Sequence, residues 1–186
     1  CARHRIGNDF TAKRRREPLV HVLLVGPSGT GKSTFSHVIA NELGVDCYEV
    51  EAPVSHETLL GLREAMTDGD LLRIEEIHQQ AIMDRRGLSS STQPEVLYAV
   101  MEDRTLTSGT GILPFPEITV IGTTTDEGML PDPFLNRFPL RPRLVPYSEV
   151  DLGIMAIWNA QRLGFDIEVE AAGMFAAASR GVPRQM

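Results

Sequence analysis

The residue types best suited to chemistry stand at 26–34, where the sequence reads GPSGTGKST. This stretch satisfies the pattern G-x-x-x-x-G-K-[ST], whose glycines let backbone N–H groups turn toward phosphate oxygens. Lys32 would reach the β- and γ-phosphates, Ser33 would place its hydroxyl on Mg²⁺, and Thr34 could bond an α-phosphate oxygen. The pattern predicts an ATP phosphate site formed by Gly26, Pro27, Ser28, Gly29, Thr30, Gly31, Lys32, Ser33 and Thr34.

The residues on either side supply the setting that such a loop requires. The apolar run Val20–Val25 predicts a buried strand, and Phe35–Leu43 continues as a helix. The positive N-terminal end of that helix adds to the attraction for phosphate. Strand, loop and helix therefore agree with the loop pattern.

A second chemical pair follows further along the chain. The run 70–74, DLLRI, predicts a short strand that delivers Glu75 and Glu76 at its carboxyl end, where open α/β sheets place their ligands. A phosphate-bound Mg²⁺ needs a hard carboxylate, and an attacking water needs an acceptor. We assign these tasks to Glu75 and Glu76; without the phosphate loop, two solvated glutamates starting a helix would explain them better.

The remaining pattern favours an α/β fold in which a parallel sheet is flanked by helices. Ser55 and Ser148 are good N-caps, and the threonine run after residue 121 could bond the attacking water or the γ-phosphate. The elements expected are a helix ending at 12–17, strands at 45–50, 118–123 and 140–146, helices from 55, 94, 148 and 169, a serine-rich loop at 87–93, a hairpin or loop at 104–116 and a short helix or turn at 131–138.

Composition narrows the class of protein. A chain of 186 residues with 42% hydrophobic and 23% charged residues suits one globular domain with a proper core. The formal net charge of -7 argues against a protein that coats nucleic acid with a uniformly basic surface. No apolar run reaches the ~20 residues of a membrane-spanning helix, and Cys1 and Cys47 form no metal or disulfide spacing. We expect a soluble, cytoplasmic protein with inert thiols.

Two single residues have ordinary interpretations from their local sequence. His21 lies at the start of the first strand with no second ligand at metal-like spacing, which favours a hydrogen-bonded core or edge histidine. Arg137 lies in the short helix or turn at 131–138, and alone it indicates a solvated surface.

Taken together, these motifs resemble the AAA+ ATPases and, within them, the RuvB family of Holliday-junction branch-migration motors. The similarity runs from about Thr11 to the end of the sequence. The matching stretches, in order, are EPLVHVLLVGPSGTGKST, IEEIH, EVLYAVMEDRTL, IGTTTDEG, LNRF and SRGVPR.

The resemblance implies roles for residues at the matching positions. Glu75 and Glu76 take the metal and water roles of the family's acidic pair, and Thr125 matches its polar sensor. Arg137 matches the arginine finger that reaches the ATP of a neighbouring subunit. The further nucleotide contacts implied are Tyr147, Arg184 as the second sensor, and the segment Glu102, Asp103 and Arg104.

The resemblance also implies domains and partners. Residues 1–147 would form the large ATPase domain and 148–186 the start of a small helical lid, with no winged-helix domain visible. The cofactors would be ATP and Mg²⁺. The expected partners are further copies in a hexameric ring, branched or double-stranded DNA, and a possible junction-binding protein.

The sequence departs from the family pattern at three places. Glu75 stands where the family usually has aspartate, and Arg73 occupies a strand position that should be apolar. The segment after Asp103 is shorter than the hairpin with which the family docks its junction-binding partner.

Two alternatives remain open at this point. One is a nucleotide-dependent switch or scaffold that binds ATP and hydrolyses it poorly, for which Glu75 and Arg73 are the motivation. The other is a different AAA+ remodeller, either clamp-loader-like or protein-unfolding.

Overall fold

The computed structural model describes residues 18–80, 94–109 and 111–185. The helix expected to end at 12–17 and the serine-rich loop expected at 87–93 lie outside these ranges.

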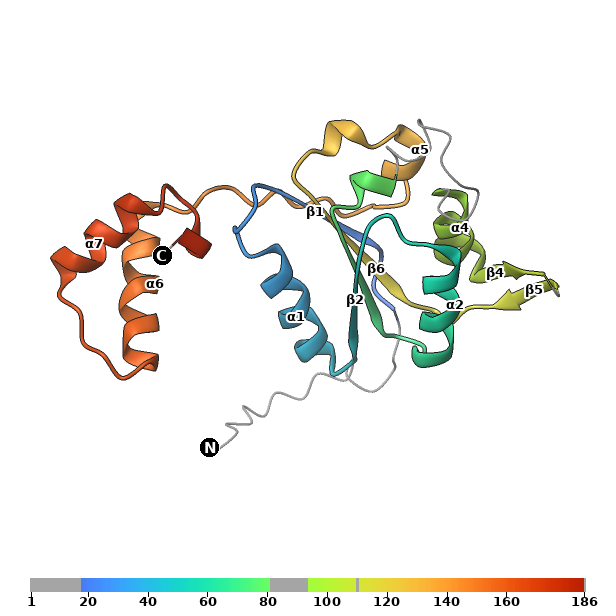
Figure 1. Cartoon of the computed structure of the whole chain (residues 1–186), viewed down its shortest axis with the longest axis horizontal. Helices are drawn as coiled ribbons and strands as arrows, with labels where there is room; N and C mark the ends of the chain where they lie inside the picture. Colours follow the sequence, from blue (N-terminus) through green and yellow to red (C-terminus); the bar gives the residue numbers. More distant parts are fainter. Residues whose placement is uncertain (1–17, 81–93, 110, 186) are drawn as a thin grey trace.

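A four-stranded parallel sheet forms the centre of the fold (Figure 1). Its strands are β1 (Val22–Val25), β2 (Cys47–Glu51), β3 (Leu71–Glu75) and β6 (Thr119–Thr124), arranged in the order β1-β6-β3-β2. Because all four run parallel, their carboxyl ends meet at one edge of the sheet. The predicted parallel α/β architecture is confirmed.

Helices cover both faces of this sheet. On one side lies α1 (Lys32–Leu43), and on the other lie α2 (His56–Ala65) and α4 (Pro94–Tyr98), which continues as the π-helix η3 (Ala99–Asp103) (Figure 1). Strand β1 is buried on both faces: Val22 and Leu24 share a cluster with Ala40 of α1, whereas Leu23 and Val25 share one with α2 and α4 residues. This explains why β1 reads as a continuous apolar run.

Both predicted serine caps are confirmed. Ser55 accepts a hydrogen bond from the backbone N–H of Thr58, at the start of α2. Ser148 accepts one from the backbone N–H of Asp151, at the start of α6 (Glu149–Arg162). Each satisfies a donor that the first helical turn leaves unpaired.

The predicted strand at 140–146 was wrong in extent. This segment lies parallel to β1 but makes two isolated bridges, Val22 with Leu140 and Val25 with Arg143. Pro142 within it has no N–H to donate, so a regular ladder cannot continue through it. Before this segment come the 3₁₀ turn η4 (Glu127–Met129) and the short helix α5 (Asp132–Leu135), which confirms the expected short helix.

Two smaller units stand at opposite ends of the molecule in Figure 1. One is an antiparallel hairpin of β4 (Thr105–Ser108) and β5 (Gly111–Pro114), where a hairpin or loop was expected. The other is the pair α6 and α7 (Val169–Ala178), followed by the 3₁₀ turn η5 (Pro183–Gln185). Among the described residues, no helix has the length and apolar character needed to cross a membrane.

Candidate functional site

The loop between β1 and α1 depends on glycine at two positions. Gly29 and Gly31 have φ of +81° and +97°, a region that other L-residues rarely adopt. A Cβ at Gly29 would also lie 2.6 Å from Val182 Cγ1 and 3.0 Å from Arg184 Cβ. Gly29 therefore serves both the turn and the close approach of the C-terminal segment.

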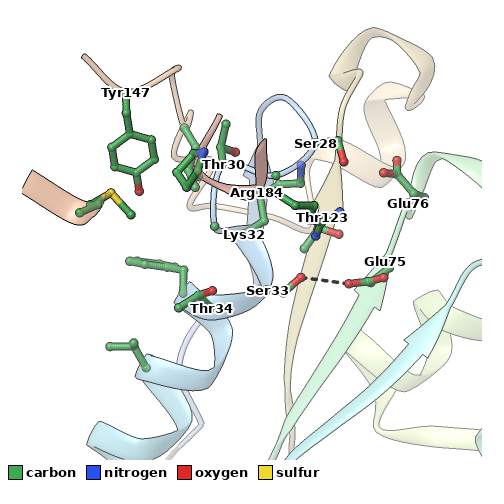
Figure 2. A pocket seen from close by; sticks show the side chains of 17 residues that line it. Ser28, Thr30, Lys32, Ser33, Thr34, Glu75, Glu76, Thr123, Tyr147 and Arg184 are labelled. Atoms are coloured by element: carbon green, nitrogen blue, oxygen red, sulfur yellow. Dashed lines mark hydrogen bonds between the residues drawn. The ribbon is translucent and has the colours of Figure 1, made fainter. Parts of the chain in front are cut away.

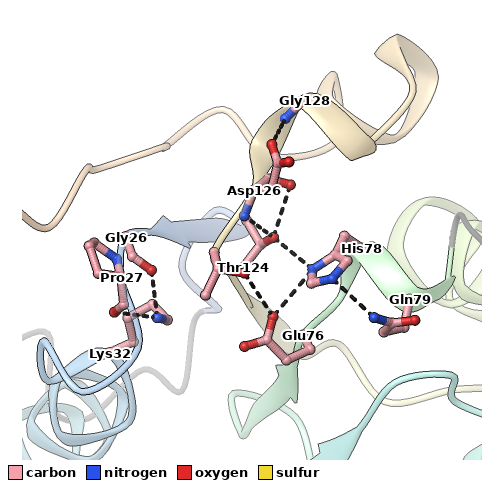
Figure 3. Close-up of polar contacts among 10 residues, drawn as sticks. Gly26, Pro27, Lys32, Glu76, His78, Gln79, Thr124, Asp126 and Gly128 are labelled. Atoms are coloured by element: carbon pink, nitrogen blue, oxygen red, sulfur yellow. Dashed lines mark hydrogen bonds and ion pairs between the residues drawn. The ribbon is translucent and has the colours of Figure 1, made fainter. Parts of the chain in front are cut away.

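Lys32 is folded back over this loop. Its side chain is largely buried, and Nζ donates hydrogen bonds to the backbone oxygens of Gly26 at 2.7 Å and Pro27 at 2.9 Å (Figure 3). Burial lowers the pKa of Lys32 below its ordinary value; Arg184 lowers this pKa further, whereas Glu76 and Glu75 oppose the shift. The ammonium is thus held where the loop encloses a ligand.

Ser33 joins the loop to the acidic strand. Its Oγ donates a hydrogen bond of 3.0 Å to Oε1 of Glu75, the last residue of β3 (Figure 2). Both groups are hard oxygen donors, the kind of ligand that Mg²⁺ prefers. The two residues predicted to serve the metal are therefore in direct contact.

Glu76 follows β3 in a left-handed conformation with φ of 46°. Its Oε2 lies 3.3 Å from His78 Nδ1 and accepts a hydrogen bond of 3.5 Å from the hydroxyl of Thr125 (Figure 3). An uncommon backbone conformation for a residue with a side chain thus turns this carboxylate toward the strand ends.

His78 was not singled out from the sequence, although it belongs to the IEEIH stretch. Its Nδ1 lies 3.0 Å from the hydroxyl of Thr124, which itself donates to Asp126 O and accepts from Asp126 N. Since that hydroxyl has no second proton to give, we assign the histidine proton to Nδ1. Nε2 then accepts from the Gln79 amide at 3.1 Å.

These groups surround a cavity of about 590 Å³. In Figure 2, Glu75 and Glu76 lie on one side of the phosphate loop and Tyr147 on the other. The apolar residues of the wall come from several elements and carry no motif. The cavity is lined by Ser28, Gly29, Thr30, Gly31, Lys32, Ser33, Thr34, Phe35, Val38, Glu75, Glu76, Thr123, Leu144, Tyr147, Met155, Pro183 and Arg184.

The C-terminal segment completes this wall. Tyr147 N donates a hydrogen bond of 2.9 Å to Gly181 O, which ties the end of the extended segment to the turn after α7. Arg184 thereby reaches the cavity from η5. Of the residues predicted around the phosphate loop, Tyr147 and Arg184 are the ones furthest away in sequence.

Arg137 lies outside this cavity. Its Nη2 makes an ion pair of 2.8 Å with Glu102 Oε2, its guanidinium stacks 3.8 Å from the ring centroid of Tyr98, and Nη1 donates to Pro133 O. The arginine is therefore held firmly by its own chain, beside the segment that follows α4.

The segment Glu102, Asp103 and Arg104 also lies outside the cavity lining. Arg104 pairs with Glu117, and its backbone oxygen accepts from Phe115 N at 2.7 Å. Thr125 lies at the rim through its bond to Glu76, whereas Thr123 is the threonine that lines the wall.

The remaining candidates are explained by packing. His21 Nδ1 accepts from Val120 N at 3.0 Å and Nε2 contacts Met101 O at 3.2 Å, so this half-buried ring is the hydrogen-bonded core or edge histidine that was expected. Burial raises the pKa of the Cys47 thiol, so little reactive thiolate is present at neutral pH.

A glycine-rich loop that connects a buried strand to a helix, with acidic residues at the end of a neighbouring parallel strand, defines a P-loop nucleotide-binding domain. A family model described as the Holliday junction DNA helicase RuvB P-loop domain matches residues 9–144. The chain belongs to the RuvB P-loop domain family.

Individual relatives agree with this assignment. The chain is 39% identical over 183 residues to the Holliday junction branch migration complex subunit RuvB of Staphylococcus haemolyticus, covering 93% of this chain and 53% of the relative. A mutant of Thermotoga maritima RuvB superposes with a TM-score of 0.81 at 33% identity, over 94% of this chain and 55% of that one. The structure named as the Thermotoga maritima RuvB Holliday junction branch migration motor gives 0.77 at 34%, over 94% and 54%. The chain thus spans about half the length of the relatives it matches.

Proposed function

We propose that this chain is the ATP-hydrolysing module of a motor that drives branch migration of Holliday junctions. The observation that carries the proposal is the convergence of Lys32, Ser33, Glu75 and Glu76 on one cavity, which Arg184 also lines. The motor activity is proposed from the names of the relatives, which describe branch migration.

The phosphate loop would bind the triphosphate. Backbone N–H groups of 28–33 and the N-terminus of α1 offer positive partial charge, and the Lys32 ammonium would leave the carbonyls of Gly26 and Pro27 for the β- and γ-phosphates. Thr34, in the first turn of α1, would bond the α-phosphate.

Mg²⁺ fits this site because Ser33 Oγ and Glu75 Oε1 already place two hard oxygens 3.0 Å apart. Ser33 would bind the ion directly and Glu75 would hold its water shell. When bound, Mg²⁺ supplies charge neutralisation on the phosphate oxygens.

Glu76 would orient the attacking water and accept its proton. Its partners His78 and Thr125 contact one of its oxygens and hold the carboxylate at the strand ends. Thr125 would act as the polar sensor that reports whether the γ-phosphate is present.

Arg137 would act on the ATP of a neighbouring copy. In support, it lies outside the cavity of its own chain and is held in place by Glu102 and Tyr98. A cation supplied between copies offsets charge that develops during phosphoryl transfer. The segment Glu102, Asp103 and Arg104 would then lie near that neighbouring nucleotide, in a hexameric ring.

Residues 1–147 would form the large domain, and 148–186 the beginning of the lid. Because Tyr147 and Arg184 line the cavity from this boundary and from η5, nucleotide binding would pull the two parts together. The proposed substrate is branched or double-stranded DNA, and the β4–β5 hairpin is the candidate contact for a junction-binding protein.

The test replaces one oxygen of the proposed base and leaves its size unchanged. Glu76→Gln should lower the ATP hydrolysis rate by about 10² or more while ATP affinity stays within about twofold. Glu51→Gln, at the exposed end of β2 and outside the cavity, is the matched control and should keep the parent rate. A parent chain without ATP turnover, or a Glu76→Gln variant at full rate, would contradict the proposal. If unfolded protein stimulated ATP hydrolysis and four-way junction DNA did not, the chain would instead be a protein-unfolding AAA+ remodeller.

A further inference from the structure

The two departures of β3 from the family pattern are in contact with each other. Arg73 and Glu75 are two residues apart on one strand and point to the same face of the sheet, toward α1. Arg73 Nη1 lies 3.1 Å from Glu75 Oε1, the oxygen that accepts from Ser33. An arginine in an apolar position and a glutamate in place of aspartate therefore form one unit.

The neighbouring strand fixes the other end of this arginine. Glu49 of β2 is the register partner of Arg73, and its Oε2 accepts from Arg73 Nη2. The second oxygen of Glu49 lies 2.7 Å from His37 Nε2. Because His37 and Ser33 are one turn apart on α1, the polar chain begins and ends on the same helix.

Burial makes this arrangement costly for Arg73. Its side chain is 5% exposed, whereas those of Glu75 and Glu49 are 44% and 39% exposed. Its Nε and Nη1 are buried and donate no hydrogen bond among the described residues, so Nη1 meets Glu75 Oε1 as an ion pair, whereas Nη2 donates to Glu49. A guanidinium in such a place gives little stability relative to an apolar side chain of similar volume. Its contribution is more directly the placement of the two carboxylates beside it.

We propose that Arg73 is a positioning residue for Glu75, braced from β2 by Glu49. The longer side chain of glutamate brings its carboxylate to Ser33, and the guanidinium holds that carboxylate from the side opposite the loop. This inference rests on the proposed function, in which Glu75 serves the metal-bound nucleotide.

The experiment measures how much Mg²⁺ increases affinity for a slowly hydrolysed ATP analogue, so it does not need turnover. The variants are Arg73→Met, Glu75→Asp and their combination, with melting temperature as the second readout. Arg73→Met should reduce the Mg²⁺-dependent gain about tenfold, leave the affinity without Mg²⁺ within about twofold, and leave the melting temperature unchanged or higher.

The double-mutant cycle identifies the partner. With aspartate at position 75, the side chain would be too short for the guanidinium to hold its carboxylate. In that background, Arg73→Met should therefore reduce the Mg²⁺-dependent gain in affinity by less than about twofold. Arg73→Lys should restore part of the gain, and Arg141→Met, which removes an arginine paired with Glu127 outside the cavity, should have no effect.

Equal losses in both backgrounds, or an equal loss of affinity with and without Mg²⁺ together with a lower melting temperature, would overturn the inference. If Arg73 and Glu75 are coupled in the double-mutant cycle but the parent does not hydrolyse ATP, the proposed function alone would be contradicted. A parent that hydrolyses ATP with additive variants would contradict the inference alone. A parent with no Mg²⁺-dependent gain would contradict both.

Discussion

The hydroxyl of Ser33 donates a 3.0 Å hydrogen bond to Glu75, so the first turn of α1 is joined to the end of β3. These residues are far apart in sequence, and the parallel order of β1, β6 and β3 brings them together. The phosphate loop and the acidic strand therefore act as a single site, and its geometry makes several variants informative.

Removing this hydroxyl should weaken metal-dependent binding. In Ser33→Ala, Glu75 loses a hydrogen bond and the ion loses a ligand, so the Mg²⁺-dependent gain in ATP affinity should fall about tenfold, measured by titration with a fluorescent nucleotide. Ser36→Ala on the same helix is the control, because that buried hydroxyl bonds the backbone oxygen of Lys32. Equal effects of the two changes would contradict the assignment of Ser33.

Gly29→Ala should destabilise the chain and displace the C-terminal segment. The new Cβ would meet Val182 and Arg184, and the positive φ adds strain of order 1–3 kcal/mol. Gly61→Ala is the matched control: this glycine lies inside α2 with open space around its Cβ, so the change should stabilise by about 0.5–1 kcal/mol. Urea unfolding measures the free energy of unfolding of both variants. If Gly29→Ala left this free energy unchanged, η5 would not pack on the loop.

Arg184→Ala should lower ATP affinity about tenfold, because the cavity loses one of the cations that line it. It should also raise the pKa of Lys32, since Arg184 is one of the groups that lower it. Arg162→Ala, in the last turn of α6, changes the same charge outside the cavity and should leave affinity unchanged. Equal losses for the two arginines would indicate a general charge effect.

His21 should make the fold sensitive to acid. Burial lowers the pKa of its ring in the folded chain, although the bond to Met101 O opposes the shift. The unfolded chain therefore takes up a proton first, so the stability from His21 is complete above about pH 6.5 and is lost as the pH falls below it, by at most about 1.4 kcal/mol per pH unit.

His21→Gln should flatten that part of the profile, measured as unfolding free energy in urea between pH 7 and 5. An unchanged slope in His21→Gln would show that the ring does not titrate differently in the two states.

Local patterns predicted what depends on neighbours in sequence. The glycine-rich turn between β1 and α1, the serine caps of α2 and α6, and the buried strands β1, β3 and β6 follow from spacing and composition, and the structure confirms these elements. The position of Glu75 and Glu76 at a strand end followed from the same reasoning.

Contacts between distant segments were not predictable in this way. Met155 and Leu144 line the cavity because α6 and the segment beside β1 are brought there by the chain path, and no motif marks them. The partners of Arg73 depend on the register of β2 against β3, which its strand pattern does not contain. Pro142 shows the converse: a local rule limited the 140–146 segment to isolated bridges, although its apolar residues favoured a strand.

The most direct measurement is the ATP hydrolysis rate of Lys32→Ala and Arg137→Ala, each alone and in an equimolar mixture, as protein concentration rises. Each variant alone should be nearly inactive. Lys32→Ala lacks the ammonium that would bind the phosphates, and Arg137→Ala lacks the cation proposed to act on the ATP of a neighbouring copy. In the mixture, about a quarter of the interfaces pair an intact loop with an intact arginine, so activity should return with increasing concentration. Full turnover by either variant alone, or a mixture no more active than its components, would contradict an ATPase site shared between copies.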